Sequence, residues 1–202
     1  MNDIYDKLDI MIPNPHCELE YNHDYELLIA TVLSAQCTDK RVNMVTKKIF
    51  SKYDLYSLNK LSVKEIENMI RSLGSFTKKA VYIKDITNHL INDCNGIVPN
   101  DRKYLESLNG VGRKTCNVVL AELFDEPTFA VDTHVLRVSK RLGLSKSDNP
   151  LTVEKKLSKL FPKEKYNRVN HQLLLFGRYI CKAKKPECDK CLFKDSCKIK
   201  KS

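Results

Sequence analysis

The chain has 202 residues, enough for one large domain or two small ones, and 42% of them are hydrophobic, which allows a sizeable core and excludes general disorder. It contains only 6 Gly and 7 Pro, too few for a collagen-like or turn-rich all-β protein. No apolar stretch approaches the roughly 20 residues that span a bilayer, and the acidic start lacks the basic segment of a signal peptide. We therefore expect a cytoplasmic protein that does not contact membranes.

Positive charge is concentrated near the carboxyl end of the chain. The formal net charge is +10, but residues 1–30 carry −6 whereas residues 178–202 carry +6. Lys accounts for 27 of the 35 basic residues, an excess that an AT-rich genome would produce in any protein. The local concentration indicates a polyanionic partner, with nucleic acid first. A solvated Lys-rich tail explains the charge alone equally well.

Apolar residues recur at helical spacing along nearly the whole chain. The pattern predicts helices around residues 4–11, 25–33, 42–49, 63–70, 76–90, 104–108, 113–124, 133–142, 152–161 and 166–181. Asp101, Asp132 and Thr152 stand where N-caps belong, and Gly74 and Gly143 stand just past helix ends. No alternating strand of five or more residues is evident, so we expect an all-α fold.

Two glycines stand one residue apart in the segment 108–115, LNGVGRKT, between a predicted helix that ends near Ser107 and one that runs from Arg113. Such glycines allow a tight turn with positive φ and expose bare backbone. The turn leads into a helix N-terminus, whose N–H groups and dipole favour an anion. This pattern predicts a helix-hairpin-helix, which grips a DNA phosphate without reading base sequence. An ordinary turn between two helices is the alternative.

Lys114 and Asp132 are candidate catalytic residues. Lys114 lies at the start of the second hairpin helix, where its amine could act as a nucleophile or simply contact a phosphate. Asp132 follows the apolar residues 129–131 and precedes a helix, which is the position of an N-cap. A cap fixes a carboxylate in space, so capping and catalysis are compatible. His134 fits either a pocket lining or a structural role.

Four of the eight cysteines form the pattern C-x6-C-x2-C-x5-C, at Cys181, Cys188, Cys191 and Cys197. Four thiolates at this spacing can surround one metal centre. Zinc sites usually consist of two short C-x2-C pairs, whereas one such pair with wider arms favours a [4Fe–4S] cube, one per chain, over zinc.

Three lysines, Lys182, Lys184 and Lys185, lie between the first two of these cysteines. They would either compensate the negative charge of the cluster or form a basic loop that contacts DNA phosphates.

Four segments together resemble one known family. They are LSAQCTD at 33–39, LNGVGRKT at 108–115, AVDTHV at 130–135 and the four-cysteine pattern at 181–197. In this order they resemble endonuclease III, a family of bifunctional DNA glycosylases and AP lyases in the helix-hairpin-helix glycosylase superfamily. The resemblance extends from about Tyr25 to Cys197.

The resemblance implies a two-lobed all-α fold, with DNA across the cleft between the lobes. A six-helix barrel domain would comprise residues 17–126, with the helix-hairpin-helix at about 101–124. A second helical domain would combine residues 1–16 with 127–202 and carry the iron–sulfur cluster loop at 181–197. The protein would act as a monomer on double-stranded DNA that contains damaged pyrimidines or abasic sites.

The resemblance also implies roles for individual residues. Lys114 corresponds to the family's nucleophile and Asp132 to its essential carboxylate. Gln36 would fill the space left by the extruded base, and Asp39 would belong to the lesion pocket. The hairpin contacts with DNA would come from Gly110, Val111, Gly112 and Arg113.

The chain departs from the family pattern at two places. Asn109 stands where the family usually has Pro, and Asn tolerates turn geometry well. Ser75, followed by Phe76, stands where the family often has a bulky Leu that wedges into the duplex. The identity of the wedge residue is therefore open.

The function indicated by these observations is removal of oxidised pyrimidines from duplex DNA, followed by cleavage of the strand at the abasic site by β-elimination. A monofunctional glycosylase of the same superfamily is one alternative, and Lys114 argues against it because water-using relatives lack an amine there. A non-catalytic iron–sulfur DNA-binding protein is another, and the presence of both Lys114 and Asp132 argues against it. A zinc-containing binding module is a third.

Overall fold

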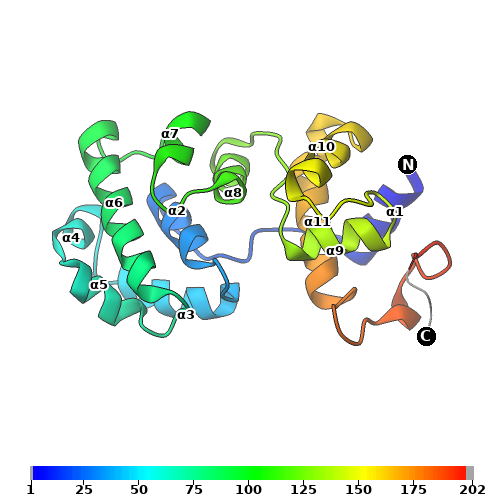
Figure 1. Ribbon diagram of the computed structural model, residues 1–202, viewed down its shortest axis with the longest axis horizontal. Coiled ribbons are helices and arrows are strands. Elements are labelled where there is room, and N and C mark those ends of the chain that lie inside the picture. Colours follow the sequence, from blue (N-terminus) through cyan, green and yellow to red (C-terminus); the bar gives the residue numbers. More distant parts are fainter. Residues whose placement is uncertain (1, 199–202) are drawn as a thin grey trace. The chain divides into compact units, whose positions relative to one another are not determined.

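A computed structural model describes residues 2–198 of the chain, and every regular element in that range is a helix (Figure 1). The expected all-α class is confirmed. The chain divides into two compact units, Cys17–Phe124 and the combination of Met1–His16 with Asp125–Ser202. The second unit's expected range includes residues 199–202, which lie outside the described part. None of the helices in residues 2–198 combines the length and apolar character needed to cross a membrane.

The unit Cys17–Phe124 contains seven helices. They are α2 (Asp24–Leu33), α3 (Asp39–Phe50), α4 (Leu55–Lys60), α5 (Val63–Ile70), α6 (Phe76–Cys94), α7 (Arg102–Ser107) and α8 (Arg113–Phe124). The sequence pattern did not predict α4, because only two of its residues, Leu55 and Leu58, are buried. Asp54 nevertheless begins this helix, since its carboxylate accepts a hydrogen bond from the Ser57 backbone N–H at 2.7 Å.

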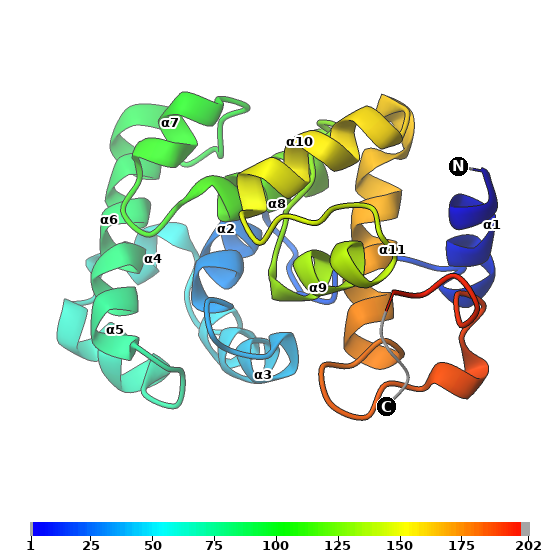
Figure 2. The same cartoon turned by 45° about the vertical axis from the view of Figure 1, so that its right-hand side comes forward.

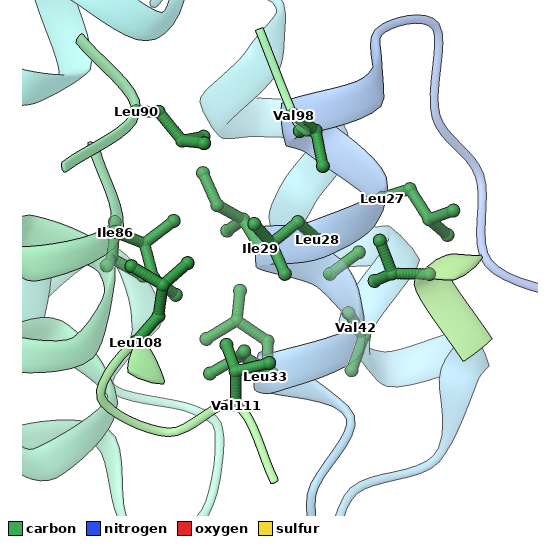
Figure 3. Packing of buried hydrophobic residues seen from close by; sticks show 14 of the residues in the cluster. Leu27, Leu28, Ile29, Leu33, Val42, Ile86, Leu90, Val98, Leu108 and Val111 are labelled. Atoms are coloured by element: carbon green, nitrogen blue, oxygen red, sulfur yellow. The ribbon is translucent and has the colours of Figure 1, made fainter. Parts of the chain in front are cut away.

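Helix α2 runs through the middle of this unit's core. All of its residues from Glu26 to Leu33 are buried, and the helix packs against α3, α6 and α8. A helix that is apolar on every side requires such surroundings. Figure 3 shows Leu28, Leu33 and Ile86 in this core together with Leu108, which precedes the glycine turn, and Val111, which lies between its two glycines.

The second unit contains α1 (Asn2–Met11), α9 (Thr133–Arg141), α10 (Pro150–Leu160) and α11 (Tyr166–Tyr179), with short 3-10 turns at Lys163–Lys165 and Cys188–Lys190. Helix α1 lies beside α11, although more than 150 residues separate them in the sequence (Figure 2). Asp9 Oδ1 accepts hydrogen bonds from Arg168 Nη2 at 2.6 Å and Gln172 Nε2 at 2.6 Å. Burial alone would raise the pKa of Asp9, but these bonds outweigh it and lower the pKa. The start of the chain is therefore fixed to its last long helix.

One expected helix start is wrong. Thr152 is not the N-cap of α10, because its backbone N–H donates to Asn149 Oδ1 at 3.1 Å and Pro150 occupies the first helical position. Asn is at least as good a cap as Thr, and Pro favours the first position. The expected caps Asp101 and Asp132 are confirmed, as is the position of Gly143 just past α9, with φ of +75°.

Candidate active site

The two glycines lie in a short turn between two helices, as the sequence predicted. Helix α7 ends at Ser107 and α8 begins at Arg113. The turn closes through a hydrogen bond from Val111 N–H to the Leu108 carbonyl at 3.1 Å. Helix α8 then starts with a bond from Cys116 N–H to the Gly112 carbonyl at 2.9 Å. The segment is a helix-hairpin-helix with its N–H groups at the start of α8 available to an anion.

The three residues at the tip of the turn have different roles. Val111 is only 3% exposed and its side chain is part of the core, so only its backbone can reach a phosphate. Gly110 has φ of +84°, and a Cβ there would lie 2.4 Å from Cδ2 of Tyr82. Gly112 has open space around the corresponding position. Gly110 is therefore required by the fold, whereas Gly112 leaves the backbone uncovered at the surface.

Side chains of helix α6 contact this turn. The Tyr82 ring lies against Gly110, and Asp85 Oδ2 accepts a hydrogen bond from the Asn109 N–H at 3.2 Å. Tyr82 and Asp85 are three residues apart and so share one face of the helix. Neither residue is identified by the sequence pattern, because helical spacing alone does not say which distant turn a polar face meets.

Lys114 and Arg113 are exposed at the start of α8. They occupy its first two positions, next to the hairpin turn. The side chain of Lys114 is therefore accessible to a ligand held at the helix N-terminus. Its expected role as a nucleophile requires this accessibility.

Gln36 and Asp39 lie on the connection between α2 and α3. Gln36 is exposed and has φ of 58°, a left-handed conformation that residues with side chains rarely adopt. Thr38 caps α3 by accepting a hydrogen bond from Arg41 N–H at 3.3 Å. Asp39 is the first residue of α3 and is half-buried. The side chain of Gln36 thus projects from a short, sharply bent segment.

The residues at the expected wedge position differ in exposure. Ser75 is exposed and has φ of 56°, while Phe76 opens α6 and is packed partly against the core. Phe76 therefore has less surface available than a residue that projects freely.

Asp132 and the cysteines belong to the other unit. Asp132 Oδ1 accepts hydrogen bonds from the backbone N–H groups of His134 at 2.9 Å and Val135 at 2.8 Å, which makes it the N-cap of α9. Both bonds end on Oδ1, so Oδ2 takes no part in the cap. The helix terminus holds the half-buried carboxylate in one orientation.

His134 is held against α11 as a structural residue. Burial lowers its pKa, and the opposing effect of Asp132 is smaller. The imidazole is therefore neutral at neutral pH, and its Nδ1 accepts from Arg137 Nη2 at 3.2 Å because an arginine can only donate. Arg137 also donates to the Gly177 carbonyl at 2.7 Å. Of the two roles expected for His134, this geometry favours the structural one.

All four clustered cysteines line one cavity of ≈ 680 Å³ in the loop that follows α11. Burial raises the pKa of Cys191, and Cys181, Cys197 and Cys188 raise it further, as expected where four thiols gather. Within residues 2–198, no three His, Cys, Asp or Glu side chains are placed to hold a single metal ion.

Arg141 of α9 supplies positive charge to this cavity. Its Nη1 lies 3.3 Å from Cys181 Sγ and donates to the Lys182 carbonyl at 2.8 Å. Cys197 Sγ lies 3.6 Å from the Arg141 carbonyl. Both ends of the cysteine loop are therefore tied to one residue.

The three loop lysines are not equivalent. Lys182 forms an ion pair with Glu187 at 2.8 Å. Lys184 and Lys185 are exposed and have no ion-pair partner within the described residues. Lys185 also has φ of 51°. The positive charge that this loop offers to a ligand comes mainly from Lys184 and Lys185.

The chain is similar to known proteins over nearly its full length. Residues 29–163 match the HhH-GPD superfamily base excision DNA repair protein family. Endonuclease III of Rickettsia conorii is 46% identical over 98% of this chain and 94% of that protein. Endonuclease III of Bacillus subtilis is 45% identical over 96% of this chain and 89% of that protein.

Two solved structures are also similar. A non-covalent endonuclease III–DNA complex matches with a TM-score of 0.94 and 47% identity, over 98% of this chain and 93% of that one. A trapped endonuclease III–DNA covalent intermediate matches with a TM-score of 0.93 and 46% identity, over 98% and 95%.

The all-helical fold and the helix-hairpin-helix define a base excision DNA repair protein. The chain belongs to the HhH-GPD superfamily and, within it, to the endonuclease III family. It is an enzyme with a DNA glycosylase and lyase role in base excision repair.

The two hairpin glycines should respond differently to substitution. We expect Gly110→Ala to lower the free energy of unfolding by about 2 kcal/mol or more, because of the positive φ and the contact with Tyr82. Gly112→Ala should stay within ~0.5 kcal/mol of wild type, since its surroundings are open. Chemical denaturation followed by circular dichroism measures both, and equal losses would contradict this account of the turn.

Proposed function

We propose that the chain removes oxidised pyrimidines from duplex DNA and then cleaves the strand at the abasic site by β-elimination. The observation that carries this proposal is the position of Lys114, an exposed lysine in the first turn of the helix that follows the hairpin. An amine held beside a bound phosphate can attack the sugar of the same strand. We further propose that the protein acts as a monomer in the cytoplasm.

Binding would begin with the DNA backbone. Gly112 and Arg113 are exposed at the start of α8. The backbone N–H groups there bind a phosphate without reading the base sequence. The damaged base leaves the stack before any chemistry, and a weakened base pair reduces the cost of this step. Gln36 would enter the space left behind, and Asp39 would contact the lesion.

Lys114 and Asp132 would carry the chemistry. Asp132 either accepts a proton from the amine or stabilises the positive charge that develops on the sugar. The neutral Lys114 Nζ forms a bond to C1′ as the base leaves with the electron pair of its glycosidic bond. The nitrogen electron pair of this adduct then breaks the C1′–O4′ bond, so that the sugar ring opens, O4′ takes up a proton as the C4′ hydroxyl, and an imine forms between Nζ and C1′. The imine acidifies the proton on C2′. When that proton is removed, its electron pair forms a C2′–C3′ double bond and the 3′ phosphate leaves.

The four loop cysteines fit a [4Fe–4S] cluster. Four thiols of one chain surround one cavity, with Arg141 Nη1 beside Cys181 Sγ, and thiolates are the ligands of such clusters. We propose that Cys181, Cys188, Cys191 and Cys197 hold it. The cluster, when bound, would fix the shape of the loop, and none of the steps above needs it.

We propose that the basic loop contacts DNA phosphates rather than compensating the cluster. Arg141 donates toward the cavity, and Lys182 is paired with Glu187. Lys184 and Lys185 are exposed and free for phosphates.

The nucleophile can be tested by trapping. We expect Lys114→Gln to abolish borohydride trapping and strand cleavage on abasic DNA, because the covalent step has no other amine. Its binding of abasic DNA should remain within about tenfold of wild type, equivalent to ~1.4 kcal/mol. Lys64→Gln is the matched control, since Lys64 is exposed on α5 and pairs only with Glu67. Trapping of Lys114→Gln at the wild-type rate would show that another amine is the nucleophile.

The role of Asp132 can be separated from its capping of α9. Asp132→Asn keeps an oxygen that accepts from His134 and Val135 N–H, so unfolding free energy should change by less than ~0.5 kcal/mol. Single-turnover excision of thymine glycol should fall by roughly 100-fold or more, because the charge is lost. Asp54→Asn, the same change at the N-cap of α4, should leave excision unchanged. Excision by Asp132→Asn within threefold of wild type would refute a catalytic role.

Metal analysis tests the cofactor. Protein produced anaerobically with sufficient iron should contain about four irons per chain and absorb broadly near ~400 nm. Cys188→Ser should lose iron, whereas Cys94→Ser, which lies outside the loop, should retain it. One tightly bound zinc with no iron in the wild-type protein would contradict the proposed cluster.

A further inference from the structure

Lys79 on α6 is a buried cation. It is 3% exposed, and no other Lys or Arg within residues 2–198 is buried. Removing an ammonium group from water is costly unless its charge and its donors are satisfied. Lys79 therefore needs specific hydrogen-bond partners that offset the free-energy cost of removing its ammonium group from water.

The three partners of Lys79 all come from the segment that carries Gln36. Lys79 Nζ donates to the Leu33 carbonyl at 2.9 Å, to the Ala35 carbonyl at 2.8 Å and toward Cys37 Sγ at 3.5 Å. An ammonium has three N–H donors, so these contacts use all of them. Ala35 and Cys37 are the immediate neighbours of Gln36.

This segment needs an external support. Leu33 ends α2, and the last carbonyls of a helix have no partner within it. A cation at this end is favoured by the helix dipole. Gln36 has φ of 58°, a conformation that costs free energy for a residue with a side chain. The bonds from Lys79 satisfy two carbonyls that precede this strained residue, those of Leu33 and Ala35, and Lys79 also contacts the Cys37 sulfur that follows it.

We propose that Lys79 is a positioning residue for Gln36. Its three bonds hold residues 33–37 in the conformation that directs the exposed Gln36 side chain outward before DNA binds. Because the segment is already ordered, insertion of Gln36 into the duplex does not bear the entropy cost of ordering it. The inference rests on the proposed role of Gln36 in filling the space left by the extruded base.

The test is a double-mutant cycle read as damage discrimination. The measured quantity is the ratio of Kd for an undamaged duplex to Kd for the same duplex with a tetrahydrofuran abasic analogue. The variants are Gln36→Ala, Lys79→Met and the double variant, compared at a temperature where circular dichroism shows all of them folded. We expect each single change to lower the ratio about tenfold, and the double change to lower it no further than about tenfold, since both remove the same contact.

Lys78→Met is the matched control. Lys78 is exposed on the same helix, so its loss changes both Kd values alike and leaves the ratio unchanged. If Lys79→Met does not fold, Lys79→Gln, which retains two donors, replaces it in the cycle. A merely stabilising lysine would lower the melting temperature without changing the ratio.

Three results would overturn the inference. They are an unchanged ratio in folded Lys79→Met, a roughly hundredfold loss in the double variant, and an unchanged ratio in Gln36→Ala. Borohydride trapping of the wild-type protein through Lys114 is measured in parallel. Failure of trapping contradicts the proposed chemistry itself. With trapping intact, either of the first two results contradicts only the role of Lys79, whereas an unchanged ratio in Gln36→Ala also contradicts the proposed role of Gln36.

Discussion

One face of α6 sets the position of two turns in the unit Cys17–Phe124. Lys79 bonds to the segment that carries Gln36, Tyr82 lies under Gly110, and Asp85 accepts from the hairpin backbone. These three side chains are spaced by three residues, so they follow one another along the same side of the helix. A single helix of 19 residues therefore fixes both turns. Each turn can be short and strained because side chains of α6 make the hydrogen bonds and contacts that the turn does not make within itself.

The left-handed residues show where this support matters. Five residues other than glycine have positive φ in the described chain. Asn95 and Asp125 follow helix ends, and their side chains tolerate this conformation. Gln36, Ser75 and Lys185 have no such preference, and all three are exposed. The proposed function places the segments of Gln36 and Lys185 at DNA, and Ser75 stands at the position of the family's wedge residue. Strain that is retained in exposed loops is consistent with function, because a relaxed loop would be cheaper for folding alone.

Periodicity predicted most of the helices because each buries an apolar stripe, and the hairpin followed from glycine chemistry. The caps Asp101 and Asp132 followed from local hydrogen bonding, which depends only on neighbouring residues. Helix α4 was missed because its buried residues are only Leu55 and Leu58. Lys79 was missed for a different reason: it is one of 27 lysines, and its partners lie more than 40 residues earlier. Sequence motifs predict roles for the exposed residues of the site, but the buried residues that hold them in place are identified only by the tertiary structure.

The replacement of proline by Asn109 shows how such buried support can compensate for a local change. A proline before the first hairpin glycine fixes φ but has no N–H to donate. Asn109 loses that restriction and gains an N–H, which Asp85 Oδ2 accepts at 3.2 Å. A carboxylate under a phosphate-binding turn is electrostatically unfavourable. His89 Nε2 lies 3.7 Å from Asp85 Oδ1, and the pKa of His89 is raised, first by its hydrogen bond to Asp93, so the imidazole offsets part of this charge when it is protonated. The stiffness that proline would provide within the turn is provided here by the contact between Asn109 N–H and Asp85 of α6.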